Sequence, residues 1–257
     1  MKVVILCGGK GTRMAEANYA AKALVDIGGR PILWHIMKVY AAYNFNEFVL
    51  TLGHGGDAIK QYFLDYKPMT RDFTLALGEQ SRIEYLQDVD TEDWQITMAD
   101  TGLETNKGGR LARVIKYLEG EVFHLTYGDG LGDIDLTGLV AFHKSHGKIA
   151  TVTGYQPYSQ YGILNLSEAG EVTGFQEKPR LLDWINAGFM IFEPEVRDYL
   201  TDDLALDLEM EIMKRLAEDG ELMMYQHEGF WRSMDTFKEA QEMDRLWHEG
   251  APWKVWA

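Results

Sequence analysis

The chain has 257 residues, of which 46% are hydrophobic and 12% aromatic, enough for one large domain or two small ones with an ordinary core. Its 40 acidic and 25 basic residues give a formal net charge of −15. This charge argues against nucleic acid as a partner, because binding along a phosphate backbone needs a basic surface. No apolar run approaches the roughly 18–20 residues of a membrane-spanning helix, so we expect no membrane partner.

Cysteine usage and the first residues indicate the compartment. Cys7 is the single cysteine, so cysteines can form neither a disulfide framework nor a zinc site. We expect a small buried side chain rather than a catalytic thiol. The N-terminus begins with a strand-like run instead of a basic and then apolar signal, which favours the reducing cytoplasm.

Strand-like and helix-like patterns alternate through most of the chain. Strands are expected at residues 2–7, 48–52, 71–77, 83–86, 94–99, 122–127 and 149–155, with hairpin strands at 162–166 and 170–175. Helices are expected at 32–42, 58–65, 110–118, around 136–146, 208–219 and 236–250. This order predicts an α/β fold with a Rossmann-like, mostly parallel sheet, helices on both faces and a small C-terminal α+β elaboration. Nothing resembles a linker, so residues 1–257 are expected to form one domain.

The most informative motif is the glycine-rich turn after the first strand, Gly8-Gly-Lys-Gly-Thr-Arg13. Glycines let backbone N–H groups close on an anion, and an arginine supplies a planar fork of donors. A Walker loop is excluded because no Lys-Ser or Lys-Thr follows at the required spacing. A dinucleotide loop is excluded because Met14 stands where its third glycine is needed. The turn therefore predicts a phosphate site of another class.

Three more residues are candidates for phosphate or metal contacts. Lys22 lies among apolar residues, which favours a phosphate contact over a solvated position. Asp129 stands between two glycines at the end of a strand, where it could ligate Mg²⁺ or form an ordinary Asp-Gly turn. Asp235 follows two aromatic residues, and either Asp235 or Thr236 could cap the next helix.

Other polar patterns are less specific. Glu177-Lys178-Pro179, taken alone, is more typical of a surface turn than of a site. The loop 100–110 is rich in polar residues and glycine and runs into a helix, which suits a ligand site at the helix N-terminus. His143 and His146 share one face of an expected helix, and we interpret this as a solvated face.

Together these segments resemble the sugar-phosphate nucleotidylyltransferase family, with its nucleotide-diphospho-sugar transferase fold, essentially from end to end. Residues 27–37, 108–114, 230–236 and 246–254 are similar to its cytidylyl branch in particular. The resemblance implies an enzyme that transfers the CMP moiety of CTP to a sugar 1-phosphate, with glucose 1-phosphate as the expected acceptor and Mg²⁺ as cofactor. Such a transfer needs no protein nucleophile, because it depends on positioning and charge neutralisation.

The resemblance also implies roles for individual residues. It assigns CTP binding to Leu6, Gly8, Gly9, Lys10, Gly11, Thr12, Arg13, Lys22, Thr105, Gly108 and Arg110. It assigns the sugar phosphate to Tyr127, Gly128, Gly162, Glu177, Lys178 and Asn186, and Mg²⁺ to Asp129 and Asp235. Arg13, Lys22 and Lys178 are the implied catalytic residues. Relatives tend to be homo-oligomers, and Trp247, Trp253 and Trp256 fit either a subunit interface or a cover over the domain's own core.

Two segments depart from the family pattern. Ala20-Ala-Lys-Ala-Leu24 stands where the family usually has Lys-Pro-Lys-Pro-Met, and Lys10 is a candidate to replace the missing cation. Arg180–Trp184 is apolar and aromatic, beside Asn186, where the family tends to be small and glycine-containing. The alternatives are therefore a cytidylyltransferase for another small phosphorylated acceptor, or a non-catalytic nucleotide-binding module of the same fold.

Overall fold

The computed structural model describes residues 1–9, 21–78, 82–86 and 92–256. Its centre is an eight-stranded sheet with the strand order β15 (Leu222–His227), β10 (Ala150–Tyr155), β14 (Met190–Phe192), β8 (Phe123–Tyr127), β1 (Val3–Leu6), β4 (Glu47–Leu52) and β7 (Gln95–Asp100). The short β13 (Ile185–Asn186) continues the line of β14 along β10. β13 and β14 run antiparallel to their neighbours and the other pairs are parallel, which confirms the predicted sheet.

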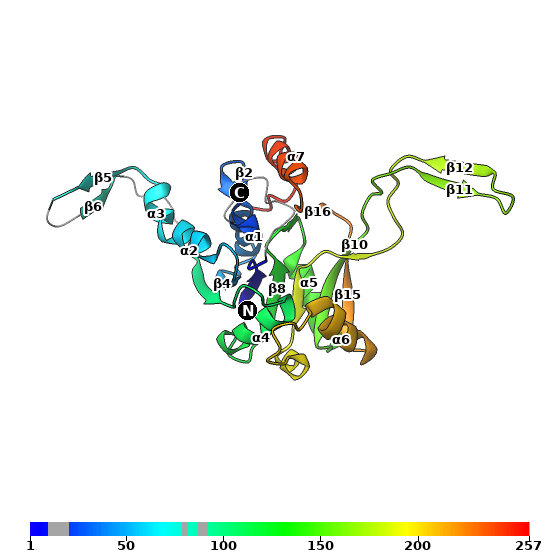
Figure 1. Ribbon diagram of the computed structural model, residues 1–257, viewed down its shortest axis with the longest axis horizontal. Helices are drawn as coiled ribbons and strands as arrows, with labels where there is room; N and C mark the ends of the chain where they lie inside the picture. Colours follow the sequence, from blue (N-terminus) through cyan, green and yellow to red (C-terminus); the bar gives the residue numbers. More distant parts are fainter. Residues whose placement is uncertain (10–20, 79–81, 87–91, 257) are drawn as a thin grey trace.

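Helices cover both faces of this sheet, as predicted (Figure 1). Val3 and Ile5 of β1 belong to one core, which includes α1 (Ile32–Ala41), α5 (Leu136–His146) and α7 (Phe237–His248). Val4 and Leu6 belong to a second core with α4 (Lys107–Val114), the 3₁₀-helix η4 (Pro194–Tyr199), the π-helix η5 (Leu208–Met213) and α6 (Lys214–Glu218). A strand buried on both faces needs an unbroken apolar run, which is why β1 reads Val-Val-Ile-Leu.

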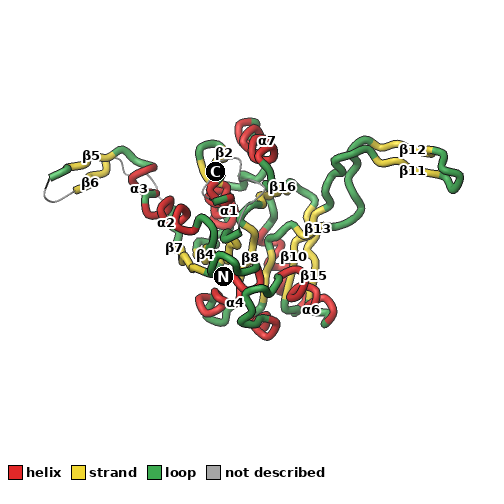
Figure 2. Tube along the Cα trace, viewed as in Figure 1, coloured by secondary structure: helices red, strands yellow, loops and turns green. Residues whose placement is uncertain are grey.

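Two arms extend from opposite sides of the sheet (Figures 1 and 2). One contains α2 (Gly56–Leu64), α3 (Tyr66–Met69) and the hairpin of β5 (Phe73–Ala76) with β6 (Arg82–Tyr85). The other is the hairpin of β11 (Ile163–Leu166) with β12 (Val172–Gln176). The strands of both hairpins are largely exposed, so they contribute little to either core.

The expected helices and strands are present with shifted ends, and several short elements were not expected. These are β2 (Asp26–Ile27) paired with β3 (Arg30–Pro31), β9 (Gly130–Gly132) paired with β16 (Trp231–Ser233), the 3₁₀ turns η2 (Lys22–Leu24) and η3 (Ile115–Tyr117), and α3, β13, β14, β15 and η4. The helix expected at 208–219 begins as the π-helix η5. There the carbonyl of Asp207 accepts the N–H of Ile212, five residues later, at 3.3 Å.

The C-terminal tryptophans cover the domain's own core. Trp253 is fully buried, and its ring lies 5.9 Å from His35 and 6.3 Å from Trp247 between centroids. Trp247 in turn packs over Gly28, where a Cβ atom would lie 2.0 Å from the indole ring. None of the described helices is long and apolar enough to cross a membrane.

The interpretation of His143 and His146 as a solvated face is wrong for His143, which is 2% exposed. This face of α5 packs on the start of β10, where the Thr151 hydroxyl lies 2.7 Å from His143 Nδ1 and 2.8 Å from His146 Nε2. The backbone N–H of Lys148 donates to His146 Nδ1 at 2.9 Å. Burial, with the neighbouring His146, lowers the pKa of His143 to about 4, so both hydrogen-bonding patterns are those of neutral rings.

We predict that mild acid destabilises the protein through its buried histidines. Burial lowers the pKa of His124 to about 3 and that of His35 to about 4. The unfolded chain binds these protons near pH 6.5, so the stabilisation is fully present above that pH and is lost as the pH falls towards 4. For the fully buried His124 alone, the free energy of unfolding should drop by roughly 2 kcal/mol between pH 7.5 and pH 5.

Urea unfolding at the two pH values measures this drop. His124→Leu should remove its share, because among the described residues no group hydrogen-bonds either ring nitrogen of His124. His248→Leu is the matched control at an exposed histidine. A free energy of unfolding that does not change over this pH range would contradict the prediction.

Candidate active site

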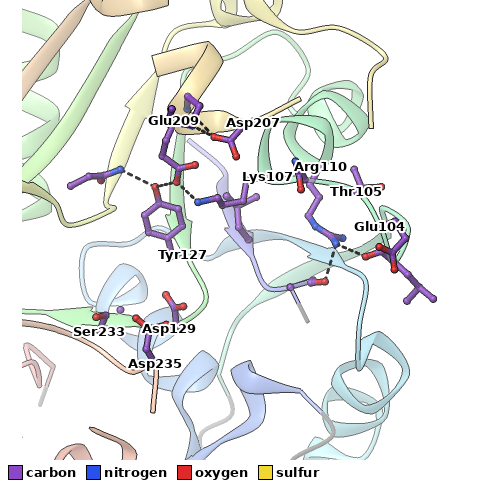
Figure 3. A pocket seen from close by; sticks show the side chains of 18 of the residues that line it. Glu104, Thr105, Lys107, Arg110, Tyr127, Asp129, Asp207, Glu209, Ser233 and Asp235 are labelled. Carbon is purple, nitrogen blue, oxygen red and sulfur yellow. Dashed lines mark hydrogen bonds and ion pairs between the residues drawn. The ribbon is translucent and has the colours of Figure 1, made fainter. Parts of the chain in front are cut away.

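A cavity of about 990 Å³ opens beyond the carboxyl ends of β1 and β8 (Figure 3). Ligands of open α/β sheets bind at this edge. The predicted site residues that line it are Leu6, Gly8, Gly9, Thr105, Arg110, Tyr127, Asp129, Asn186 and Asp235. Leu103, Glu104, Asn106, Lys107, Gly130, Asp207, Glu209, Met210, Trp231 and Ser233 complete the lining among the described residues.

A two-stranded ribbon brings the two aspartates of the cavity together. Asp129 directly precedes β9, and Asp235 follows β16 by two residues. The strands pair antiparallel, and the N–H of Met234 donates to the carbonyl of Asp129 at 2.8 Å. Thr236 is the N-cap of α7 and forms a capping box with Glu239, so the cap and the site carboxylate are different residues of the pair.

Lys22 lies between these two carboxylates. Its Nζ is 2.6 Å from Asp129 Oδ2 and 2.6 Å from Asp235 Oδ1. Burial lowers the pKa of Lys22, but the two aspartates outweigh burial and raise it above the ordinary value, so the side chain is a cation. Lys22 was predicted to contact phosphate, and the structure adds that it neutralises the predicted metal ligands.

The aspartate pair fits a divalent metal ion. Hard cations such as Mg²⁺ are commonly held by one or two carboxylates, with substrate phosphates and water as the other ligands. Within the described part of the chain, no cluster of three or more His, Cys, Asp or Glu side chains could hold a metal by itself. The donor set therefore suits an ion that arrives with, or is completed by, a phosphorylated ligand.

Arg110 is 3% exposed, and its guanidinium lies against the backbone at Gly8. Its Nη2 donates to the carbonyl of Gly8 at 2.9 Å and its Nη1 to the carbonyl of Leu52 at 3.1 Å. The same guanidinium donates to the hydroxyl of Thr101 at 2.6 Å and to the carbonyls of Gly102 and Leu103. Arg110 therefore fixes three chain segments at the floor of the cavity and leaves a positive charge beneath them.

The position of the Arg110 guanidinium explains why residues 8 and 53 are glycines. A Cβ atom at Gly8 would lie 2.3 Å from Arg110 Nη1, and one at Gly53 would lie 2.5 Å from the same atom and 2.5 Å from the Gly8 carbonyl oxygen. Gly8 was expected to leave room for a ligand. In the structure its missing side chain leaves room for Arg110.

The N-terminus of α4, expected to bind a ligand, is covered by the segment before η5. The N–H groups of Asn106 and Gly109 donate to the carbonyls of Leu204 and Leu206 at 2.8 and 3.1 Å. A Cβ at Gly108 would lie 2.8 Å from the Leu206 carbonyl, so this glycine serves close packing and does not line the cavity. The N–H groups of Asn106 and Gly109 are therefore used within the chain, while Thr105, Asn106 and Lys107 line the cavity. CTP binding by Thr105, Gly108 and Arg110 stays a prediction.

Other predicted residues lie elsewhere. Gly128 also does not line the cavity; its N–H donates to the carbonyl of Leu6 at 3.0 Å. Gly162 and Glu177 lie together on the arm that carries β11 and β12. Lys178 lines a second cavity of about 1220 Å³, which shares Trp231 and Ser233 with the first. Lys10, Gly11, Thr12 and Arg13 lie outside the described residues.

Lys107, Asp207 and Glu209 line the cavity, although no specific sequence pattern indicated a functional role for them. Asp207 accepts the N–H groups of Glu209 and Met210 at 2.9 and 2.8 Å, as an ordinary helix cap does. A carboxylate in a first helical turn is also common, because it is favoured by the helix dipole. Only the polar loop 100–110, which contains Lys107, had drawn attention to this region.

An α/β sheet whose first strand ends at a glycine pair, beside two carboxylates that share a lysine, is typical of nucleotide-handling proteins. Residues 2–245 match the nucleotidyl transferase family. The chain belongs to this family.

Relatives of known name match the whole chain. A protein of Bacillus subtilis (strain 168), named probable glucose-1-phosphate cytidylyltransferase, is 46% identical over 258 residues and covers 100% of both chains. The glucose-1-phosphate cytidylyltransferase of Salmonella typhi is 43% identical over 260 residues with the same coverage. A solved structure of UDP-glucose pyrophosphorylase complexed with UDP-glucose shares the fold, with a TM-score of 0.67 at 13% identity over 96% of this chain and 98% of that one.

We predict that Gly53→Ala destabilises the protein by about 1–3 kcal/mol, because its Cβ would displace Arg110 or the Gly8 carbonyl in a packed site. Urea unfolding measures the change. Gly78→Ala is the matched control, since no atom lies within 4 Å of a Cβ placed there. Equal stability of Gly53→Ala and the wild type would show that Arg110 does not constrain this turn.

Proposed function

We propose that this protein transfers the cytidylyl group of CTP to α-D-glucose 1-phosphate, giving CDP-glucose and pyrophosphate. The observation that carries the proposal is the cluster of Asp129, Asp235 and Lys22 beside the Gly8–Gly9 turn. It is supported by full-length relatives, 43–46% identical, that are named for this reaction. The family membership supports an enzyme rather than a non-catalytic module.

The chemistry is a direct displacement. A phosphate oxygen of the sugar 1-phosphate attacks the α-phosphorus of CTP in line, the α–β bridging P–O bond breaks, and pyrophosphate leaves. Asp129 and Asp235 would hold Mg²⁺, which neutralises charge on the phosphates when bound. Lys22 adds positive charge at the same place, and buried Arg110 holds the carbonyl of Gly8 by a hydrogen bond. The protein supplies position and charge, which are the main needs of phosphoryl-type transfer.

The direct test is pyrophosphate release from the pure protein with Mg²⁺, CTP and glucose 1-phosphate. UTP, dTTP, ATP and GTP, and other phosphorylated acceptors, run in parallel. We expect release with CTP that depends on glucose 1-phosphate, and a fall in kcat of ~10²–10³-fold for Asp129→Asn. Release with another acceptor only would replace glucose 1-phosphate in the proposal. No release with any pair would contradict an enzymatic role.

We predict that Lys22→Met makes the free protein more responsive to Mg²⁺. Without the ammonium the two carboxylates lose the cation that they share, so the melting temperature should fall in EDTA and rise by several degrees with Mg²⁺ alone. The wild type should respond little. Lys148→Met is the control, because it removes an ion pair with Glu221 just before the start of β10. The same Mg²⁺ response in wild type and Lys22→Met would rule out competition between Lys22 and the metal.

We further propose that the chain forms a homo-oligomer and acts in the cytoplasm, where CTP and sugar phosphates are made. The β11–β12 arm supports the oligomer, because Leu164, Leu166, Val172 and Phe175 are 54–62% exposed on it. Apolar surface of this kind is typical of protein interfaces. Light scattering coupled to gel filtration measures the mass, and a monomer at micromolar concentration would contradict the proposal.

A further inference from the structure

One wall of the active-site cavity is a chain of four hydrogen-bonded side chains (Figure 3). Asn186 Nδ2 donates to the Tyr127 hydroxyl oxygen at 2.8 Å. The Tyr127 hydroxyl donates to Glu209 Oε1 at 2.7 Å. Lys107 Nζ forms an ion pair with the same oxygen and lies 5.3 Å from the centre of the Tyr127 ring. The wall therefore joins β13, β8, η5 and α4.

Both ends of this chain are fixed by the backbone. Asn186 Oδ1 accepts the N–H of Gly188 at 2.8 Å, which orients the carboxamide so that its NH₂ group faces Tyr127. Glu209 is the second residue of the π-helix η5, and its own N–H donates to the Asp207 carboxylate at 2.9 Å. Short π-helical segments are frequent at functional sites, where they place a side chain that a regular helix would turn away.

The directions of these bonds leave acceptors facing the cavity. The proton of the Tyr127 hydroxyl is committed to Glu209, and Asn186 takes one lone pair, so one lone pair of Tyr127 remains. Within the described chain, no side chain donates to Glu209 Oε2. Burial, with the Glu209 carboxylate second, raises the pKa of Tyr127, so the hydroxyl stays protonated. The free lone pair of Tyr127 and the Oε2 atom of Glu209 suit ligand hydroxyl groups, which donate hydrogen bonds.

We propose that Glu209 is a positioning residue for hydroxyl recognition: it holds the Tyr127 proton and the Lys107 ammonium, and thereby makes this wall a hydrogen-bond acceptor for sugar hydroxyls. The inference rests on the proposed function, and it adds two residues, Glu209 and Lys107, to the part of the site that binds substrate hydroxyl groups. The hydroxyls belong to the acceptor sugar or to the ribose of the nucleotide, which share this chemistry. Separate experimental arms distinguish them.

The test variant is Glu209→Gln, which keeps the shape of the side chain, loses its charge and releases Lys107. Loss of a hydrogen bond to a charged group typically costs one to two orders of magnitude in affinity. We expect KM for glucose 1-phosphate to rise about tenfold, with little change in kcat and in KM for CTP. Tyr127→Phe should act in the same direction. The double variant should be scarcely worse than Tyr127→Phe, because the two residues act as one unit.

Substrates that lack one hydroxyl identify the ligand group. Deoxyglucose 1-phosphates should be poorer acceptors than glucose 1-phosphate for the wild type, and this preference should shrink in Glu209→Gln. If the ribose is the partner, the preference for CTP over dCTP shrinks instead and KM for CTP rises. Either result supports the proposal that this wall accepts hydrogen bonds, and it identifies the substrate whose hydroxyl group donates them.

Glu211→Gln is the matched control. Glu211 is an exposed carboxylate of the same π-helix, it accepts the N–H of Asp207 at 2.9 Å, and it does not line the cavity. Two results would overturn this inference and leave the proposed function standing. One is an equal effect of the two glutamate variants, and the other is a lowered melting temperature of Glu209→Gln with unchanged Michaelis constants. A wild type that releases no pyrophosphate with these substrates would overturn the proposed function on which it rests.

Discussion

The floor of the active site depends on one buried cation, the guanidinium of Arg110. Its donors are used by the carbonyls that end β1 and β4 and by the loop after β7, so three parallel strands are joined at their carboxyl ends through one side chain. A buried charge of this kind is tolerated only when its hydrogen bonds are satisfied. The constraint explains why residues 8 and 53 are glycines.

Local pairing of charge is the second theme of the site. The chain carries a net charge of −15 and yet must bind phosphates, so its cations have to be concentrated where they are needed. Lys22 is held between two aspartates, which fix its ammonium before a ligand binds. A ligand at this place therefore does not have to order a free side chain. Lys107 is paired with Glu209 on another wall, where the pairing leaves the second carboxylate oxygen of Glu209 as an acceptor.

Sequence patterns carry little information where the contact partners are distant. The helix expected at 208–219 begins as the π-helix η5, which the N-cap residue Asp207 does not indicate. Carbonyls of a segment about a hundred residues away accept N–H groups at the start of α4, next to loop residues that line the cavity. Lys178 and Asn186, which were assigned to the same ligand, line two different cavities that share Trp231 and Ser233. Spacing along the chain carries no information on such encounters.

The α/β alternation, the buried parallel strands and the residue types at the ends of β1 and β8 could be predicted from the sequence, because they follow from local hydrophobic periodicity and glycine placement. Asp129, Asp235 and Lys22 were each candidates from the sequence, as separate residues. Folding brings one lysine between both aspartates, 107 and 213 residues away along the chain, and joins Tyr127, Asn186, Glu209 and Lys107 in one wall, and neither contact could be read from the sequence. The physical reason is that strand order, and not sequence order, sets which strand ends meet at the edge of a sheet.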